Sequence, residues 1–338
     1  MLAYAAPYID PSLFWPAAFF GLMHPVLLIL NALFLVYWVI QVKLRLIFNL
    51  GMLVLGIPSF NKIVTFGTET LPLREDKLKV VSFNAKLFGI YEDANYFDEF
   101  LKEITEKNPD IMCIQEFYNL DYNGSTALKE IKKQAGLPYH YFRTLKRKTG
   151  KSRYGIIVFS KYKIIDYGDL DFGGNTVNLC LYADILHASK TVRIYNIHLQ
   201  SLKLARTDYA LLKKIGEDSD STIQVSKNIF NRLKTAFIKR GEQAIMAKEN
   251  MENCGKPIIL CGDFNDTPQS FAYSTLSKDL KDCFMESGNG LGGTYTGPLP
   301  NLRIDYILHE PSMVSYNYLA SKNYNSDHKM IESIIDIK

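Results

Sequence analysis

The chain lacks the cysteine and histidine patterns that mark disulfide scaffolds and the common zinc sites. Its five cysteines show no C-x-x-C spacing, and no H-E-x-x-H occurs. An odd cysteine count without a framework argues against disulfide bonding, and the missing motifs exclude the commonest zinc sites. No internal repeat is visible, which argues against a solenoid. The net charge of +4 is too small to indicate a nucleic-acid partner by itself.

Charge is nearly absent from the beginning of the chain, where only Asp10, Lys43 and Arg45 occur before residue 62. Residues 11–42 carry no charged group and include VLLILNALFLVYWVI at 26–40. With the apolar residues that precede it, this run exceeds the 18 or so residues of a membrane-spanning helix. A segment of this kind predicts attachment to a lipid bilayer.

We predict a membrane anchor over 1–66 with two transmembrane helices, near 16–40 and 46–61. A linker over 67–77 would join it to a catalytic domain over 78–338. A cleaved signal peptide would have a basic start and a shorter apolar core, and this sequence has neither. A buried hairpin in a soluble core is the other alternative.

The orientation of such an anchor follows from its few cations. Lys43 and Arg45 lie between the two apolar segments, and no Lys or Arg precedes the first. The positive-inside rule therefore places this loop in the cytoplasm and the catalytic domain on the external or periplasmic side. Lys62 and Arg74, which follow the second segment, weaken this prediction.

The catalytic part contains many short apolar runs rich in Ile, Val and Leu, which predict buried strands. These runs lie at 78–85, 109–116, 154–160, 178–186, 191–199, 256–262 and 303–309. Helical patterns occur near 96–107 and 221–251. This alternation predicts an α/β fold, a four-layered sandwich of two packed mixed β-sheets flanked by helices, preceded by the transmembrane helices.

Polar side chains stand at the ends of these predicted strands: Asn84, Glu116, His198, Asp263, Asn265, Asp305, Asp327 and His328. Each alone has an ordinary explanation as a turn residue, a helix cap or a buried histidine. Together they offer carboxylate oxygens, which hard divalent cations prefer. Histidines beside carboxylates indicate general acid and base chemistry.

Six short motifs carry a resemblance to a known family. In chain order they are FNA at 83–85, QE at 115–116, NIHLQ at 196–200, GDFND at 262–266, RIDYI at 303–307 and SDH at 326–328. The set resembles the endonuclease/exonuclease/phosphatase superfamily, which includes deoxyribonucleases, abasic-site endonucleases, neutral sphingomyelinases and inositol-polyphosphate 5-phosphatases. The resemblance covers about residues 78–330.

The resemblance implies a divalent-metal site. Glu116 corresponds to the family's metal-binding glutamate, with Asn84 and Asp327 near the same ion. The cofactor implied is Mg²⁺ or Mn²⁺.

The resemblance also implies catalytic roles. Asp263 would align or deprotonate the attacking water, and Asn265 would hold the scissile phosphate. Asp305 would orient His328, and His198 would serve the phosphate or the leaving group. Which histidine acts as acid and which as base stays open.

The strongest local charge is RTLKRKTGKSR at 143–153, with six basic residues. It could bind phosphates or anionic lipid headgroups, or it could be a solvated hairpin loop. Arg147 and Lys148 in this run, and Tyr154 directly after it, are the predicted substrate-binding residues.

The sequence therefore predicts a membrane-anchored, metal-dependent phosphodiesterase that acts by in-line attack of water, with nuclease-like activity favoured. One alternative is a sphingomyelinase-like or other lipid-headgroup phosphodiesterase. The extended signature of inositol-polyphosphate 5-phosphatases is missing around Asp305. A further alternative is a membrane-anchored binding protein without turnover. The predicted partners are the phosphodiester substrate and the bilayer, with no obligate protein partner.

Overall fold

The computed structural model describes most of the chain, namely residues 1–67, 77–90, 96–144, 153–173, 178–202, 219–297, 301–321 and 326–337. Within 219–226 only the backbone is described. The chain divides into two compact units. The larger unit comprises Val64–Leu199, Met246–Phe264 and Ser277–Lys338, and the smaller comprises Met1–Ile63, Gln200–Ile245 and Asn265–Leu276.

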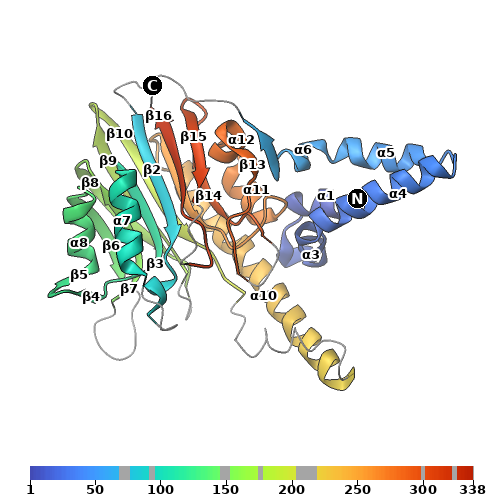
Figure 1. Ribbon diagram of the computed structural model, residues 1–338, viewed down its shortest axis with the longest axis horizontal. Helices are drawn as coiled ribbons and strands as arrows, with labels where there is room; N and C mark the ends of the chain where they lie inside the picture. The colour runs from blue at the N-terminus through green and yellow to red at the C-terminus, as the bar shows by residue number, and fades with distance from the viewer. Residues whose placement is uncertain are drawn as a thin grey trace. The chain divides into compact units, whose positions relative to one another are not determined.

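Two six-stranded sheets form the larger unit (Figure 1). The first sheet has the order β12 (Lys281–Asp282), β14 (Asp305–His309), β11 (Ile258–Asp263), β10 (Lys190–His198), β9 (Leu179–His187), β8 (Ile164–Asp171). The second has the order β15 (Val314–Ala320), β16 (Ile331–Asp336), β2 (Lys77–Asn84), β3 (Ile111–Tyr118), β7 (Tyr154–Ser160), β6 (Tyr139–Thr144). Both sheets are mixed, because β10–β11 and β2–β3 are parallel pairs and their other pairs are antiparallel.

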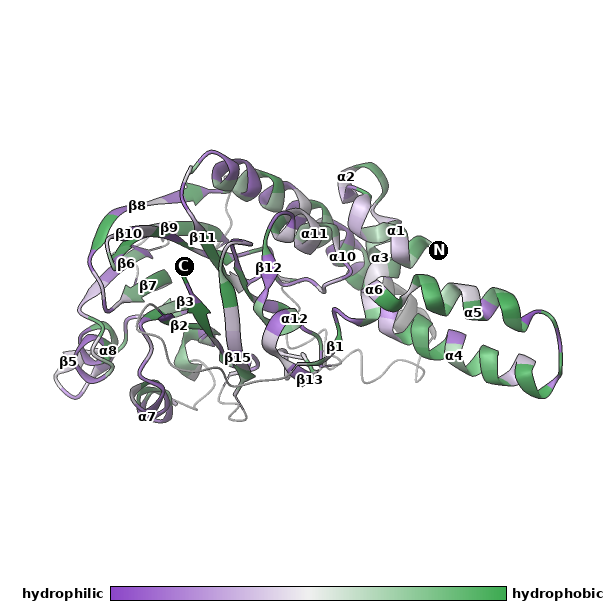
Figure 2. Cartoon of the chain, turned by 90° about the horizontal axis from the view of Figure 1, so that it is seen from above, coloured by the Kyte–Doolittle hydropathy of each residue, from purple (hydrophilic) through white to green (hydrophobic). Residues whose placement is uncertain are grey.

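The sheets pack face to face over an apolar core that includes Val80, Cys113, Ile194 and Cys261. Helices α7 (Phe97–Lys107) and α8 (Ala127–Gln134) cover the outer face of the second sheet (Figure 2). Their apolar faces join a second buried cluster with the outward side chains of β2 and β3. Two mixed sheets flanked by helices confirm the predicted fold class of this part of the chain.

The remaining elements of the larger unit are short. They are η2 (Lys86–Gly89), α12 (Cys283–Ser287) and two small sheets, one of β1 (Val64–Phe66) with β13 (Asn289–Leu291) and one of β4 (Asp121–Tyr122) with β5 (Ser125–Thr126). The long helix α10 (Ser219–Glu252) ends in this unit, where the hydroxyl of Tyr195 in β10 donates to Oδ1 of Asn250 at 2.8 Å.

The smaller unit begins with the amino-terminal helices: α1 (Leu2–Ala5), η1 (Ala6–Tyr8), α2 (Pro11–Phe14), α3 (Pro16–Leu22), α4 (His24–Ile40), α5 (Leu46–Leu55) and α6 (Ile57–Phe60). It also contains most of α11 (Phe271–Ser277) and the part of α10 up to Ile245. Helices α4 and α5 lie side by side, and Nδ2 of Asn49 donates to Oδ1 of Asn31 at 2.5 Å. We call residues 24–55 the apolar hairpin.

The amino-terminal helices are packed into this unit rather than set apart from it. Nε2 of Gln269 donates to the carbonyl of Ala3 at 2.9 Å, and the rings of Trp15 and Phe230 meet at 4.6 Å. A Cβ added at Gly21 would lie 2.6 Å from the carbonyl oxygen of Gln269, so only glycine allows this close backbone approach. Most of the predicted linker, residues 68–76, lies outside the described residues.

The predicted transmembrane helices are not supported by the helix lengths. No single helix in the described ranges is long and apolar enough to cross a membrane. Helices α3 and α4 together satisfy length and composition, but they meet at 67°, and α5 has only 10 residues. The break fits Pro25 in the first turn of α4, where a proline begins a helix more readily than it continues one.

A half-buried carboxylate in the larger unit, Glu286, gives the fold a predictable acid sensitivity. Oε2 of Glu286 accepts hydrogen bonds from the amide and hydroxyl of Ser315 at 2.6 and 2.7 Å and lies 2.9 Å from Nε2 of His309. Burial alone would raise the pKa of Glu286, but these hydrogen bonds outweigh it and lower the pKa to about 2.

We expect Glu286→Gln to weaken the pH dependence of stability at the acid end. The pKa of Glu286 in the folded protein is below its value in the unfolded chain, which is about 4.3, so the ionised carboxylate stabilises the fold above pH 4.3. This contribution, about 1–2 kcal/mol after a discount for partial exposure, is lost as pH falls from 4.3 toward 2. Urea unfolding at pH 7, 5, 4 and 3 should show the variant and the wild type converging, whereas Glu99→Gln on the exposed side of α7 should leave the profile unchanged.

Candidate active site

The inward faces of the strands change from apolar to polar at one end of the sandwich. Along β10, Ile194 belongs to the core, and Asn196 and His198 follow on the same face because strand side chains alternate. Along β11, Cys261 is followed in the same way by Asp263. The inward-facing side chains that form the core are therefore followed, along the same strands, by polar side chains that line a site between the two sheets.

Strand register brings these ends together. His198 pairs with Asp263 in the parallel β10–β11 ladder, and Asp263 pairs with Asp305 in the antiparallel β11–β14 ladder. In the second sheet Asn84, the last residue of β2, pairs with Gln115 of β3. Three strand ends from one sheet and one from the other thus meet at the same edge.

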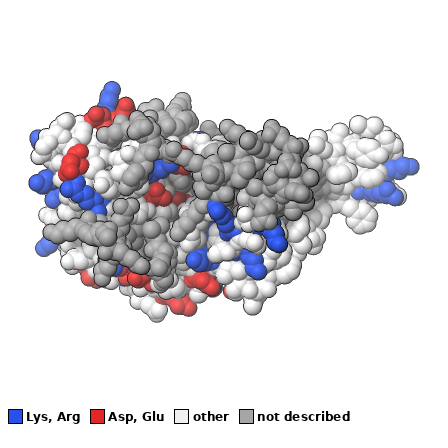
Figure 3. Space-filling model, turned by 90° about the horizontal axis from the view of Figure 1, so that it is seen from below, with Lys and Arg blue, Asp and Glu red and all other residues white. Residues whose placement is uncertain are grey.

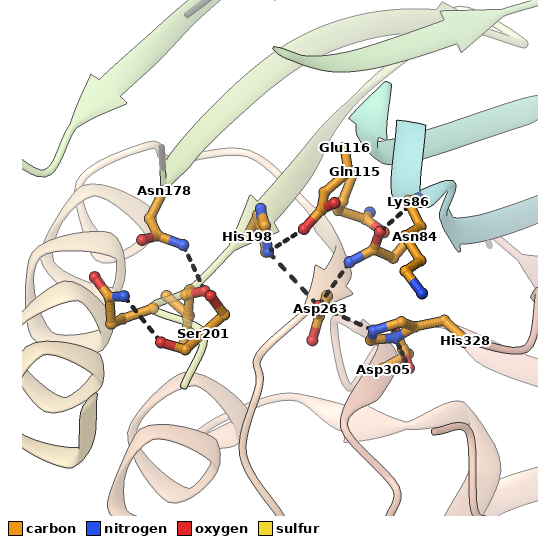
Figure 4. Close-up of polar contacts among 12 residues, drawn as sticks. Asn84, Lys86, Gln115, Glu116, Asn178, His198, Ser201, Asp263, Asp305 and His328 are labelled. Carbon is orange, nitrogen blue, oxygen red and sulfur yellow. Dashed lines mark hydrogen bonds and ion pairs between the residues drawn. The ribbon is translucent and has the colours of Figure 1, made fainter. Parts of the chain in front are cut away.

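Asp263 lies at the centre of this group (Figure 4). Its Oδ2 accepts a hydrogen bond from Nδ2 of Asn84 at 2.9 Å. The same oxygen is 3.7 Å from Nε2 of His198 and 3.8 Å from Nε2 of His328. Asp263 is fully buried, and this burial raises its pKa, while the nearby His328 opposes the rise.

Glu116 reaches the site because β3 is bulged. The register between β3 and β7 shifts between Ile114 and Phe117, and Glu116 itself has a φ of 49°. Strict alternation would place Gln115 inward and Glu116 outward; the bulge turns Glu116 inward as well. Its Oε1 lies 3.8 Å from Nε2 of His198 (Figure 4).

His328 and Asp305 form a hydrogen-bonded pair. Nδ1 of His328 lies 3.0 Å from both carboxylate oxygens of Asp305, and both residues are buried. Burial alone would lower the pKa of His328, but the charges of Asp305 and Asp263 outweigh it and raise the pKa to about 10. His328 is therefore a cation at neutral pH, with Nε2 directed toward Asp263.

The donor set fits a hard cation at Glu116. Burial raises the pKa of Glu116 to about 7, and the negative charges of Asp263 and Asp327 add to the rise. Several carboxylates gathered at one place offer the oxygen donors that Mg²⁺ or Mn²⁺ prefers. Asp263, Asp305 and His328 also offer ligand atoms within 4.8 Å of one another. In this second group, His328 and Asp305 are hydrogen-bonded to each other, which favours a role in carrying a proton over a role as metal ligands.

Lys86 is a site residue that the motifs did not single out. Lys86, Leu87, Phe88 and Gly89 all have positive φ values, from 39° to 70°. Left-handed conformations of residues other than glycine cost about 1–2 kcal/mol each, and strain of this kind concentrates at functional sites. The turn places Nζ of Lys86 3.4 Å from Oδ2 of Asp327. Its only signal in the sequence was its position two residues after Asn84.

Two hydroxyl groups hold the loops that carry these residues, and the sequence analysis gave neither of them a role. Oγ1 of Thr294 accepts from the amides of Ile304 and Asp305, each at 3.1 Å. Oγ of Ser326 donates to the carbonyl of Asn84 at 2.9 Å and accepts from the amide of His328 at 3.2 Å. The SDH motif is thereby fastened to the end of β2.

Four other residues were predicted for the site: Tyr154, Asn265, Arg147 and Lys148. Tyr154 opens β7, where burial and then the charge of Glu116 raise the pKa of its hydroxyl. Asn265 has a φ of 53° and begins a segment of the smaller unit, two residues after Asp263. Arg147 and Lys148 lie outside the described residues. The roles of these four residues stay predictions.

Comparison with known families agrees with the geometry. Residues 81–328 match the model of the endonuclease/exonuclease/phosphatase family, and residues 1–63 match a domain of unknown function. No curated protein matches the chain.

Solved structures share the fold at low sequence identity. A family protein from Bacteroides thetaiotaomicron is 18% identical with a TM-score of 0.54, covering 78% of this chain and 98% of its own. A humanized D. rerio TDP2 is 14% identical with a TM-score of 0.55, covering 77% and 99%. A mannosyl-6-phosphatase from Bacteroides thetaiotaomicron is 18% identical with a TM-score of 0.51, covering 76% and 99%.

Proposed function

The chain belongs to the endonuclease/exonuclease/phosphatase family, whose members are metal-dependent phosphoester hydrolases, and we propose that it is a membrane-anchored phosphodiesterase with nuclease-like activity. The observation that carries this proposal is the arrangement around Asp263, whose Oδ2 lies within 3.8 Å of both histidine Nε2 atoms and accepts from Asn84. In our proposal water attacks the phosphorus in line with the leaving oxygen.

Each side chain has a role in this proposal. Asp263 aligns the water and accepts its proton, because it is a buried acceptor facing two imidazoles. His328, kept protonated by Asp305, donates a hydrogen bond to a phosphoryl oxygen and stabilises charge that accumulates there. His198, between Glu116 and Asp263, serves the leaving oxygen.

Glu116 would hold the metal, with Asn84 and Asp327 beside it. A bound Mg²⁺ or Mn²⁺ supplies positive charge that stabilises the phosphoryl oxygens and the departing alkoxide. Lys86, paired with Asp327, adds a second positive charge at the same edge.

The substrate is best identified with the full-length chain, because its amino-terminal helices are part of a packed unit. Hydrolysis of single- and double-stranded DNA, RNA, sphingomyelin and phosphoinositides should be compared with and without Mg²⁺. Metal-dependent cleavage of nucleic acid supports the proposal. Cleavage of a lipid headgroup alone would replace it by the lipid phosphodiesterase alternative. Absence of hydrolysis on every substrate would support a binding protein.

The basic run 143–153 provides a test of polyanion binding. We expect charge reversal of Lys146, Arg147 and Lys148 together to weaken substrate binding most strongly at low salt, because exposed charges are screened within about 10 Å at 0.1 M salt. KM measured from 20 to 300 mM NaCl should then lose most of its salt dependence. If KM of the variant keeps the salt dependence of the wild type, the interpretation of this run as a solvated loop is favoured.

We further propose that the apolar hairpin attaches the protein to a bilayer. Ile29, Leu33, Ile40 and Phe48 are 61–79% exposed, although they lie in helices that pack on each other. Most residues of the hairpin are apolar, so α4 and α5 are largely green in Figure 2. Blue atoms gather at its end (Figure 3), between α4 and α5 where Lys43 and Arg45 lie. Helix α4 has 17 residues, about 25 Å, which approaches the hydrocarbon thickness of about 30 Å.

The hairpin predicts strong partition into vesicles. The full-length protein should float with phosphatidylcholine vesicles in a density gradient, and Leu33→Glu with Phe48→Glu should reduce the bound fraction at least about tenfold, since each buried charge costs about 3 kcal/mol. Flotation of the double variant at the wild-type level would contradict this attachment. Under the positive-inside rule, Lys43 and Arg45 favour a cytoplasmic tip and an external catalytic domain.

A further inference from the structure

The bulge that turns Glu116 inward is contacted by a side chain from the opposite sheet. Nδ2 of Asn196 in β10 donates to the carbonyl of Ile114 in β3 at 3.2 Å and to that of Ile157 in β7 at 2.8 Å. These two residues form the last ladder pair before the register shift. One amide therefore binds both main chains at the point where the ladder is broken.

The same amide also fixes the residue beside Glu116. Oδ1 of Asn196 accepts from Nε2 of Gln115 at 2.6 Å, and Nε2 of Gln115 also donates to Oγ of Ser82 in β2 at 3.2 Å. Asn196, Gln115 and Ser82 are all buried. The network thereby joins β2, β3 and β10, the strands that supply Asn84, Glu116 and His198.

We propose that Asn196 is a positioning residue, which holds the β3 bulge so that the carboxylate of Glu116 stays at the metal site. A left-handed glutamate within a strand is strained, and such strain persists only where surrounding contacts fix the backbone. Buried hydrogen bonds in a low-dielectric core provide this rigidity, and an unpaired carbonyl there is costly. Asn196 is two residues before His198 on the same face of β10, so it also ties the histidine to the bulge. The inference rests on the proposed metal site at Glu116.

The test is direct Mn²⁺ binding to the full-length protein, followed by electron paramagnetic resonance of the free ion. Asn196→Leu keeps a similar volume but removes the three hydrogen bonds that Asn196 makes to Gln115, Ile114 and Ile157. We expect its Mn²⁺ dissociation constant to rise about 10–100-fold, as replacement of groups that orient metal ligands commonly does. Tyr195→Phe is the matched control, because it removes the bond to Asn250 on the opposite face of the same strand. Its dissociation constant should stay within about twofold of wild type.

A second variant covers the case in which Asn196→Leu does not fold. Gln115→Met keeps the side-chain length and the two bonds from Asn196 to the carbonyls, so an intermediate rise in the dissociation constant is expected. If Asn196→Leu folds and binds Mn²⁺ with wild-type affinity, the positioning role is overturned and the proposed function stays intact. If Asn196→Leu does not fold, wild-type Mn²⁺ affinity in Gln115→Met overturns the role in the same way. A wild-type protein that binds no Mn²⁺ would overturn both.

Discussion

Asp263→Asn should lower turnover about 10²–10⁴-fold while the protein remains folded, since removal of a general base or of an equivalent charge-stabilising group commonly has this effect. Asparagine has the same shape, and its carbonyl can still accept from Asn84. It cannot accept the proton of water, and it withdraws the negative charge that faces His198 and His328. The change thus removes chemistry with little change in packing.

The measurement is kcat at saturating substrate and Mg²⁺, together with the thermal unfolding midpoint. Asp184→Asn is the matched control, because Asp184 is also a fully buried aspartate of the same sheet, but its carboxylate is bound by Arg193 and Lys256. The control should lose stability without a comparable loss of kcat. A kcat of Asp263→Asn within about threefold of wild type would remove this residue from the proposed chemistry.

The sequence allowed prediction of the interior strands better than the edges. β2, β3, β7, β9, β10, β11 and β14 were predicted because buried strands read as apolar runs. β6, β8, β12 and β15 were missed, and all four are edge strands, whose exposed sides interrupt the apolar pattern. β16 is an interior strand that was also missed, because Glu332 and Ser333 break its short run.

Residues of the candidate site were predictable where side chains alternate regularly between the two faces of a strand, and not where the backbone departs from this alternation. His198 and Asp263 end apolar runs and Asp305 lies at the start of one, so their inward position follows from a period of two. The inward turn of Glu116 depends on a bulge, and Lys86 depends on a left-handed turn. Neither conformation has a residue signature such as glycine at the strained position. The sequence indicated Glu116 as a carboxylate at the end of a predicted strand, and the family resemblance gave it a metal-binding role.

The amino-terminal helices show a different limit. Composition identified an apolar segment correctly but could not reveal the 67° bend after Leu22 or the short length of α5. Nor did it indicate that Ala3 and Gly21 contact Gln269, because contacts between distant segments leave no local pattern. Membrane attachment by the apolar hairpin stays a prediction.

Glu116→Gln is expected to weaken metal binding by more than about 100-fold, beyond the 10–100-fold cost of losing a group that only orients a ligand. Glutamine removes the negative charge on which a hard cation depends, while its amide keeps the length of the side chain. At a fixed 1 mM Mg²⁺ the variant should be nearly inactive, and a higher concentration should recover part of the rate. The wild type should lose activity in EDTA and regain it with Mg²⁺ or Mn²⁺.

Glu332→Gln is the matched control for this change. Glu332 lies in the same sheet but pairs with Lys79 and Lys107, so its replacement should leave the metal titration unchanged. Calorimetric titration of both variants with Mg²⁺ separates ligand loss from a general effect on folding. Recovery of the chelated wild type by Zn²⁺ alone would contradict the oxygen-ligand site, because Zn²⁺ prefers nitrogen and sulfur donors. Wild-type Mg²⁺ affinity in Glu116→Gln would move the ion to Asp263, Asp305 and His328, whose ligand atoms lie within 4.8 Å of one another.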